Sequence, residues 1–353
     1  MPTPADIHSI IGSMLMVGIR GPGPEDAAFR ADLDACREAC VGGVILFDVH
    51  LPDRTRDRNI ISPGQIRELC DHLRRELGDR LLISVDQEGG SVARLSPTRG
   101  FQPQPSAAEV AAFPYWKRHF APDRNARQVA AAGCNLNFAP CVDVAINPDN
   151  PIIAGKQRSF GVDPQVIVNC AERVIHAHTQ AGVATCLKHF PGHGSSAGDT
   201  HEGFVDITHS WQRSVELQPF RWQIPTLDPR WTCIMTAHVF HSGIDPDHPA
   251  SLSRRHTTDL LRDELGFRGV VITDSLDMGA ITQRYPAHEA LILAINAGAD
   301  ILLDGCNAPG MERPCPAREM HEAITRALRD GRIIGGEERL RASAARIARL
   351  LAR

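Results

Sequence analysis

The stretch Arg254–Ser275 reads RRHTTDLLRDELGFRGVVITDS and contains one complete repeat of the expected fold. Residues 254–265 have the amphipathic pattern of a surface helix, and Gly266 stands where a helix C-cap is expected. The apolar run Val270–Thr273 is typical of a buried strand, and the polar Asp274 follows it directly. A surface helix followed by a buried strand with a polar end is typical of α/β proteins.

The same repeat recurs along the chain. Eight such apolar runs alternate with helical patterns, which favours a closed (β/α)8 TIM-type barrel; an open doubly wound sheet is the alternative. We expect a single catalytic barrel over residues 1–353, with a helix over 337–353 on its exterior. The runs are Met14–Ile19, Gly43–Phe47, Leu81–Val85, Leu136–Ala139, Val183–Leu187, Cys233–Thr236, Val270–Thr273 and Ile301–Leu303. Further helices are expected over 62–76, 164–180 and 286–297, with glycine caps at Gly182 and Gly298.

Composition excludes several classes of protein. Of 353 residues, 42% are hydrophobic and 23% are charged, as in ordinary globular proteins. A formal net charge of −4 removes the nonspecific attraction to phosphate that nucleic-acid-binding proteins use. No apolar stretch approaches the roughly 18 residues of a membrane helix, and Asp6 stands where a signal peptide is positively charged. We therefore expect a cytoplasmic protein with neither nucleic acid nor membrane as a partner.

The ten cysteines are scattered and include no CxxC pair, so we expect reduced thiols in the core rather than a zinc site. Cys36 and Cys40 are expected to share a helix face. Cys306 and Cys315 flank a loop rich in proline and glycine.

In a barrel, chemistry takes place where the strands end at their carboxyl termini. Polar residues follow four of the predicted strands at this point, and burying them without partners would be unfavourable, so they should face a common pocket. These residues are Asp86 and Glu88, Lys188 and His189, His238, and Asp274.

The densest polar segment is KHFPGHGSSAGDTH, residues 188–201. Asp199 and His201 are two apart, so in an extended backbone both side chains emerge on one side, and the carboxylate can hold one ring nitrogen of the histidine. Such a pair suits acid/base chemistry near neutral pH. The alternative is a metal site that adds His189 and His193, against which the adjacent charge of Lys188 argues.

Asp274 fits two roles by position: a nucleophile toward a sugar, or the N-cap of a following helix. Asp277 is interpreted as structural. His176 and His178 lie in a helical pattern, cannot share a face, and are expected to be solvated.

Carboxylates and arginines around one pocket suit the hydroxyl and amide groups of a sugar. Asp86, Glu88 and Arg94 lie in SVDQEGGSVAR, and Arg158 lies in QRSFG. For Glu88 and Arg158, a structural salt bridge at the barrel rim is an equal alternative.

Several long motifs in one order make the chain resemble glycoside hydrolase family 3, in its single-barrel bacterial β-N-acetylhexosaminidase branch. The motifs are GGVILF (42–47), SVDQEGGSVARL (84–95), NLNFAPCVDV (135–144), RSFGVDP (158–164), KHFPGHG (188–194), DTH (199–201), MTAH (235–238) and GFRGVVITDSLDMGAI (266–281).

The resemblance implies roles for the residues that match. Asp274 would be the nucleophile, and Asp199 with His201 would replace the usual glutamate acid/base. The residues that would bind the sugar are Asp86, Arg94, Arg158, Lys188 and His189. No metal or organic cofactor is implied.

The implied activity is that of a retaining β-N-acetylglucosaminidase that removes terminal N-acetylglucosamine from peptidoglycan-derived muropeptides. The alternatives are a phosphorylase, a β-glycosidase of other specificity, or a barrel that only binds glycans. Separately, because the sequence shows no coiled-coil repeat and no evident sticky helix, we expect a monomer. Ser195 departs from the aspartate that many members carry after GHG. Trp211, Trp222 and Trp231 are read either as an acceptor site or as helix packing.

Overall fold

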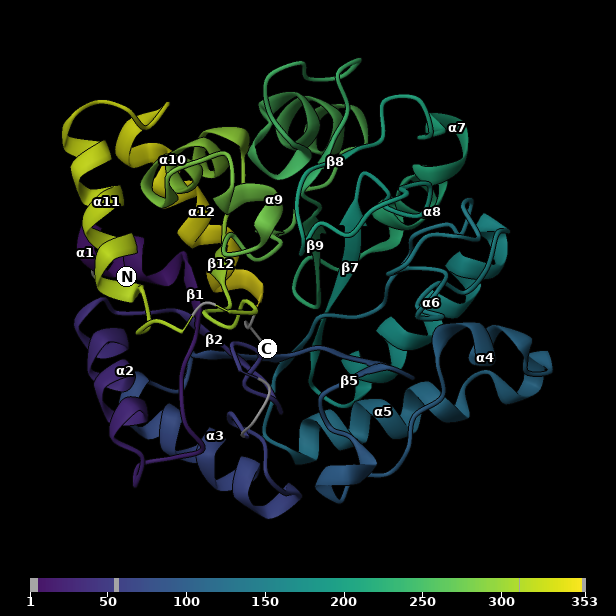
Figure 1. Ribbon diagram of the computed structural model, residues 1–353, viewed down its shortest axis with the longest axis horizontal. Coiled ribbons are helices and arrows are strands. Elements are labelled where there is room, and N and C mark those ends of the chain that lie inside the picture. The colour runs from purple at the N-terminus through teal and green to yellow at the C-terminus, as the bar shows by residue number, and fades with distance from the viewer. Residues whose placement is uncertain (1–5, 54–56, 311, 351–353) are drawn as a thin grey trace.

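The computed structural model describes residues 6–53, 57–310 and 312–350 and shows a (β/α)8 barrel with helices around a parallel sheet (Figure 1). The strands follow the order β11-β9-β7-β6-β3-β2-β1-β12, and every neighbouring pair is parallel. A parallel bridge between Ile272 and Ile301 joins β11 to the residues before β12, so the open-sheet alternative is wrong. All eight predicted strands are confirmed: β1 Leu15–Gly18, β2 Gly43–Leu46, β3 Leu82–Val85, β6 Leu136–Asn137, β7 Ala184–Phe190, β9 Thr232–Thr236, β11 Val271–Thr273 and β12 Leu302–Asp304.

The helices form the outer layer of the barrel (Figure 1). All the helices expected from the sequence are present, although η5 is a wide π-type helix. Gly182, Gly266 and Gly298 follow α6, η5 and α10 with φ of 74°, 78° and 122°, which confirms the predicted caps. The helices are α1 Ile7–Ser13, α2 Ala27–Glu38, α3 Pro63–Leu77, α4 Ala107–Ala112, α5 Phe120–Ala131, α6 Pro164–Gln180, α7 Arg213–Glu216, α8 Gln218–Gln223, η5 Arg255–Glu264, α9 Gly279–Thr282, α10 Ala287–Ala297, α11 Ala317–Arg329 and α12 Gly336–Leu350.

Helix α6 shows why one prediction failed. It begins at the N-cap Asp163 and buries a stripe on the core side that includes Val174 and, one turn later, His178. His178 accepts a hydrogen bond from Asn137 Nδ2 at 2.9 Å on Nε2 and donates from Nδ1 to the carbonyl of Val174 at 2.8 Å. Burial lowers its pKa to about 4. The expectation that His178 is solvated was therefore wrong, whereas His176 is exposed as expected.

The C-terminal helix α12 packs on the barrel exterior against α1, as predicted, and the last three residues of the expected helix lie outside the described part of the chain. It is held by Asp300, a fully buried residue just before β12. The carboxylate of Asp300 accepts hydrogen bonds from Arg262 of η5 at 2.6 Å and from Ser343 and Arg346 of α12 at 2.7 and 2.8 Å. This cluster ties three elements together at the amino-terminal end of the strands.

All ten cysteines are free thiols, and nine are buried. The exception is Cys40, which lies beyond the end of α2 in a left-handed conformation with φ of 51°. It therefore does not share a helix face with Cys36, contrary to the prediction. Cys36 Sγ lies 3.8 Å from Cys315 Sγ instead.

Short paired segments extend the loops after the barrel strands. Strand β4 (Gln87–Gly89) pairs antiparallel with β5 (Val92–Ala93), and β8 (Val205–Asp206) pairs parallel with β10 (Val239–Phe240). Within the described ranges, no helix is both long and apolar enough to cross a membrane.

Candidate active site

Lys188 is at the centre of a buried ion cluster at the carboxyl ends of β3 and β7. Its Nζ lies 2.7 Å from Asp86 Oδ1 and 2.7 Å from Glu88 Oε1. The Lys188 and Glu88 side chains are 3% and 5% exposed, whereas 18% of Asp86 remains exposed. Asp86 is thus the member of the cluster that faces solvent.

The neighbouring His189 joins the same cluster, although successive strand residues normally point to opposite faces. The register of β7 against β9 shifts between Leu187 and Phe190, and such an irregularity re-aims side chains. His189 Nδ1 donates to Asp143 Oδ2 at 2.6 Å, and its Nε2 lies 3.2 Å from Arg158 Nη2.

Arg158 forms a two-pronged ion pair with Glu88, with Nε and Nη2 donating at 2.9 and 2.8 Å. The pair is therefore a buried salt bridge, which was one of the two alternatives, and it borders the predicted sugar-binding residues Asp86 and Lys188. Because Arg158 is only 8% exposed and bonded to Glu88 and His189, its position suits holding these groups in place.

The charges in this cluster stabilise one another. Burial opposes ionisation of Glu88, but Arg158 and Lys188 more than offset it and hold its pKa well below the ordinary value. Burial likewise opposes the charge on Lys188, and Asp86 and Glu88 raise its pKa above the ordinary value. Asp143, paired with His189, has its pKa lowered to about 2 despite its burial. Glu88, Lys188 and Asp143 are therefore ionised at neutral pH.

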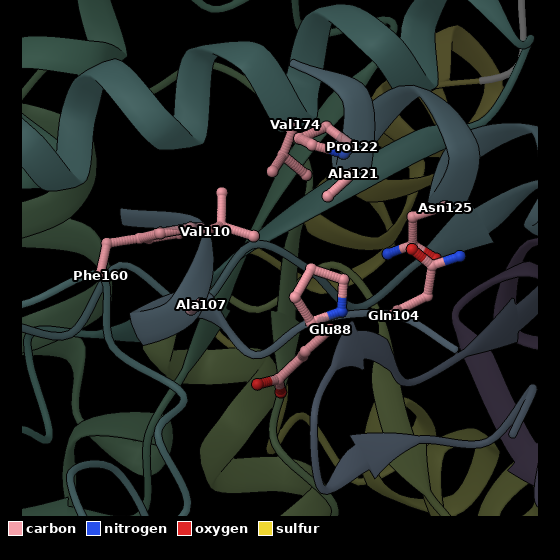
Figure 2. Close-up of a pocket in the computed structure, with 10 residues that line it drawn as sticks. Glu88, Gln104, Ala107, Val110, Ala121, Pro122, Asn125, Phe160 and Val174 are labelled. Carbon is pink, nitrogen blue, oxygen red and sulfur yellow. The ribbon is translucent and has the colours of Figure 1, made fainter. Parts of the chain in front are cut away.

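A small cavity of about 30 Å³ lies behind Glu88 (Figure 2). Its walls are mostly apolar, which explains why burial weighs so heavily on Glu88. The cavity is far below the several hundred Å³ that a bound sugar needs, so it is not the substrate site. The residues that line it include Val110, Ala121, Phe160 and Val174, with Gln104 and Asn125 on one side.

Arg94 follows β5 directly, and its backbone N–H donates a hydrogen bond to the carbonyl of Asp86 at 3.2 Å. Its guanidinium lies 5.8 Å from the ring centre of Phe47 and 3.8 Å from Asp48 Oδ1. Arg94 thus reaches the same rim from a different strand.

Asp274 follows β11 as predicted and is half-buried, with its Oδ1 accepting from the backbone N–H of Ser275 at 2.8 Å. Burial alone would raise its pKa, but His238, His189 and His201 shift it below the ordinary value. The carboxylate is therefore ionised at neutral pH. It does not cap a helix: α9 begins five residues later, at Gly279.

Asp277 accepts hydrogen bonds from Ser275 Oγ at 2.5 Å and from the backbone N–H of Asn307 at 3.1 Å, which fits the structural role expected for it.

The predicted acid/base pair forms. His201 Nδ1 donates to Asp199 Oδ1 at 2.6 Å, and the same oxygen accepts the backbone N–H of His201 at 2.8 Å. The backbone at residues 200–202 is a turn rather than the extended segment we expected, and one carboxylate oxygen of Asp199 accepts from both donors. The His201 side chain is 52% exposed, and with Nδ1 bonded to Asp199 its Nε2 has no hydrogen-bond partner among the described residues. Burial opposes the charge on Asp199, and His201 lowers its pKa to about 2.

The loop that carries this pair docks on the residues that follow Asp274. The backbone N–H of Gly279 donates to the carbonyl of His201 at 3.2 Å, and that of Ala280 donates to Thr200 at 3.1 Å. The structure thus brings the predicted acid/base and the predicted nucleophile to one end of the barrel.

The metal alternative is not supported by this geometry. His189 is bonded to Asp143, while the two ring nitrogens of His193 contact Ser196 at 2.8 Å and Thr200 at 3.3 Å. In the described part of the chain, the side chains close enough to share an ion are Cys141, Asp143 and His189, and separately His50, Asp53 and Glu312.

Asp143 supports the site but was absent from the prediction, and His238, which was expected to face the pocket, was given no specific role. Asp143 lies in the quoted motif NLNFAPCVDV but four residues beyond the predicted strand, so its position gave no clear signal. His238 follows β9 as noted in the sequence; its Nε2 donates to the carbonyl of Ser275 at 2.8 Å and its Nδ1 accepts from Ser251 Oγ at 2.7 Å. His238 therefore fixes the residue next to Asp274.

An aromatic surface with one cation lies beside the acid/base loop. Phe204, three residues after His201, is 39% exposed and lies 5.1 Å from Phe240, between ring centres. The guanidinium of Arg284 lies 3.7 Å from the ring centre of Phe204, and Arg284 has no ion pair among the residues that the structure describes. Nearby, Trp211 donates from Nε1 to the carbonyl of Pro191 at 3.2 Å, so it packs on the loop.

Comparison with known proteins agrees with this arrangement. Residues 9–350 match the Glycosyl hydrolase family 3 N terminal domain. A Beta-hexosaminidase of Xanthomonas oryzae pv. oryzae is 33% identical over 305 residues, which cover 82% of this chain and 83% of that protein. Beta-hexosaminidase A of Pseudoalteromonas piscicida is 34% identical over 284 residues, and the match covers 74% of this chain but only 45% of that longer protein.

Solved structures show the same fold. A glycoside hydrolase family 3 beta-N-acetylglucosaminidase from Paenibacillus sp. str. FPU-7 superimposes with a TM-score of 0.85 at 33% identity, over 98% of this chain and 62% of that one. A Beta-N-acetylhexosaminidase from Beutenbergia cavernae DSM 12333 gives 0.84 at 28% identity over 98% of both chains. The barrel, its strand-end carboxylate and its sequence motifs thus lead to one conclusion: the chain belongs to glycoside hydrolase family 3.

Proposed function

We propose that the protein is a retaining β-N-acetylglucosaminidase. The observation that carries the proposal is the docking of the Asp199–His201 loop on Gly279 and Ala280, because this contact joins an exposed imidazole to the strand end that bears Asp274. A carboxylate and a proton donor at one strand end are the two groups that retaining glycoside hydrolysis requires. The names of the relatives support the acetamido sugar as substrate.

In the first step, Asp274 attacks the anomeric carbon while protonated His201 donates its Nε2 proton to the leaving oxygen. The bond to the leaving group breaks as an ester bond to Asp274 forms. Asp199 holds Nδ1 of His201, which directs Nε2 outward and stabilises the imidazolium.

In the second step, neutral His201 accepts a proton from water, and the water oxygen attacks the anomeric carbon. The ester bond breaks and Asp274 is released as a carboxylate. Two inversions at the same carbon retain its configuration.

The ion cluster is proposed to bind the sugar. Asp86 has the exposure needed to accept hydrogen bonds from hydroxyl groups, and Lys188 fixes its orientation. Arg94 reaches the same rim from β5, while Arg158 and His189 hold the base of the pocket.

We further propose that the substrate is a peptidoglycan-derived muropeptide in the cytoplasm. The ten free thiols support a reducing compartment. The Arg284–Phe204 surface beside His201 supports a leaving group that offers apolar and anionic contacts, as a muropeptide with carboxylates does.

The first experiment compares an aryl β-N-acetylglucosaminide with the aryl β-glucoside. We expect strong preference for the acetamido sugar, rates independent of added phosphate, and β-N-acetylglucosamine as the first anomer seen by NMR. Asp274→Asn should lower kcat at least about 10³-fold on every substrate. His201→Ala should lose about 10²- to 10⁴-fold on poor leaving groups and much less on good ones.

Asp259→Asn, an exposed acid on η5, serves as the matched control. Equal activity on the glucoside would contradict the specificity, and release of a sugar phosphate would indicate a phosphorylase. An active Asp274→Asn variant would contradict the assignment of the nucleophile.

A further inference from the structure

Glu216 is a buried carboxyl beneath the loop that carries Asp199 and His201, and the mechanism above gives it no role. It is the last residue of α7 and is 1% exposed. Its Oε2 accepts the backbone N–H of Ser195 and its Oε1 that of Gln212, both at 3.3 Å. Among the described residues, none forms an ion pair with it. Glu216 thus bonds directly to the base of the acid/base loop.

The loop leaves little space around this carboxyl. A Cβ placed on Gly192, whose φ is 126°, would lie 2.7 Å from Glu216 Cβ and 2.9 Å from Oε2. On the other side, a Cβ on Gly194 would lie 1.7 Å from the carbonyl oxygen of Val144. Residues 192–195 are therefore confined between α7 and the segment after β6.

Ser195, the position that departs from the common family pattern, lies against Glu216 and is 3% exposed. Its hydroxyl has no hydrogen-bond partner within the described part of the chain. This hydroxyl can accept a hydrogen bond from a neutral carboxyl or donate one to a carboxylate, so it is compatible with either form of Glu216. An aspartate at position 195 would instead place a second acid beside Glu216.

The electrostatic surroundings favour the neutral carboxyl. Burial raises the pKa of Glu216 to about 7, and the charge of Asp143 adds to this, while the Ser195 side chain and the backbone N–H groups of Gln212 and Ser195 oppose it. Arg213 and Arg221 of α7 and α8 bind Glu264 on the surface.

The histidines near the loop do not supply the missing positive charge. Burial lowers the pKa of His193 to about 4, so it is neutral, and His189 is engaged with Asp143.

A chain of contacts runs from this base to the acid/base pair. Ser196 bonds to His193 Nδ1, and His193 Nε2 contacts Thr200, which lies between Asp199 and His201. Asn150 Nδ2 donates to the His193 carbonyl at 2.9 Å and to Ser196 Oγ at 3.0 Å. Glu216, whose pKa is raised to about 7, is a side chain at the base of the loop whose charge changes near neutral pH.

We propose that Glu216 is a positioning residue for the Asp199–His201 pair: its protonated form holds the base of the loop, and its ionised form loosens it. This proposal rests on the proposed function, because a change in the position of the loop is measured through its effect on proton donation by His201.

The direction of the pH effect follows from the raised pKa. Between pH 4.5, the ordinary value for glutamate, and about pH 7, the folded loop retains a proton that an unfolded chain has lost. Stability at this contact therefore falls as the pH rises through this range, and above about pH 7 the Glu216 carboxylate is buried without a cation partner among the described residues.

The test is Glu216→Gln, which stays neutral and keeps both a donor and an acceptor. We expect the ratio of variant to parent kcat/KM on a poor leaving group to rise about threefold to tenfold between pH 6 and pH 8.5. On an activated aryl leaving group, which needs no proton from His201, the ratio should change less than twofold. Glu264→Gln, a surface acid near the same helices, is the matched control and should show no such trend.

A ratio that is constant with pH, or that changes equally on both substrates, would overturn the proposal, since a merely structural role affects both alike. Hydrogen exchange of residues 192–201 gives a readout independent of activity. We expect faster exchange at pH 8.5 than at pH 6 in the parent, after correction for intrinsic rates, and less difference in Glu216→Gln. Equal corrected exchange in both would overturn the proposal, and a parent without glycosidase activity would instead contradict the proposed function.

Discussion

The barrel has a buried ion cluster at each end of its strands, and in both clusters a carboxylate is paired with a cation. The two clusters serve different purposes. At the amino-terminal end, Asp300 accepts from Arg262, Ser343 and Arg346 and from the backbone N–H of Val271, so every side of its carboxylate is occupied. At the carboxyl end, Lys188 holds Asp86, which keeps part of its surface exposed beside the acid/base loop.

The comparison teaches that burial and charge alone do not mark a functional site. Both clusters are deeply buried and both contain charges that would be unfavourable without partners. They differ in exposure, because Asp86 keeps part of its carboxylate open to solvent whereas Asp300 does not. They also differ in position, since chemistry takes place at the carboxyl ends of barrel strands and the opposite end serves stability. Substitutions in the two clusters should therefore differ in whether they lower the free energy of unfolding or the catalytic rate.

The largest effect is expected from Asp300→Ala. It leaves several arginine side chains without their anion and disconnects α12 from η5, so we expect a loss of about 3–5 kcal/mol in the free energy of unfolding. Urea denaturation measures this loss, and kcat of the folded protein at low temperature should stay within about twofold of the parent. A large fall in kcat with intact stability would contradict the structural role of this cluster.

Lys188→Met should lower activity much more than stability. Asp86 then loses the cation that orients it, and we expect kcat/KM for an aryl N-acetylglucosaminide to fall on the order of 10²-fold. The Glu88–Arg158 pair remains, so the loss of stability should be smaller than for Asp300→Ala. If Lys188→Met lowered only stability, the carboxyl-end cluster would also be structural, and the distinction between the two clusters would be lost.

The smallest effect is expected at the rim, where Arg284 is exposed. Arg284→Gln should lower kcat/KM about twofold to fivefold for a substrate whose leaving group carries a carboxylate, because exposed ion pairs are weak. A neutral aryl leaving group should be unaffected. Arg213→Gln, an exposed arginine paired with Glu264, is the control. Equal loss on both substrates would rule out recognition of the carboxylate by Arg284.

Much of the fold could be predicted because its signals are local. Apolar runs of the right length define the strands, as at Val270–Thr273, and Gly266 and Gly298 end helices with a backbone that other residues rarely adopt. The pairing of Asp199 with His201 was also predictable, since the two lie two residues apart.

Failures occurred where contacts join residues far apart in the chain. His178 was read as solvated because its own helix does not reveal that Asn137 supplies a partner for its buried ring. Asp143 was missed because its partner His189 is 46 residues away. Glu216 gave no signal at all, since its environment is created by the loop that packs over it.

The sequence by itself determined the repeated strand–helix pattern, the family motifs and the polar residues that end the strands, because periodicity and spacing are properties of neighbouring residues. Only the tertiary structure decided which charges are paired, which ring nitrogens remain available and which carboxyl keeps its proton near neutral pH. These properties depend on burial and on partners from distant segments, which come together only when the barrel closes.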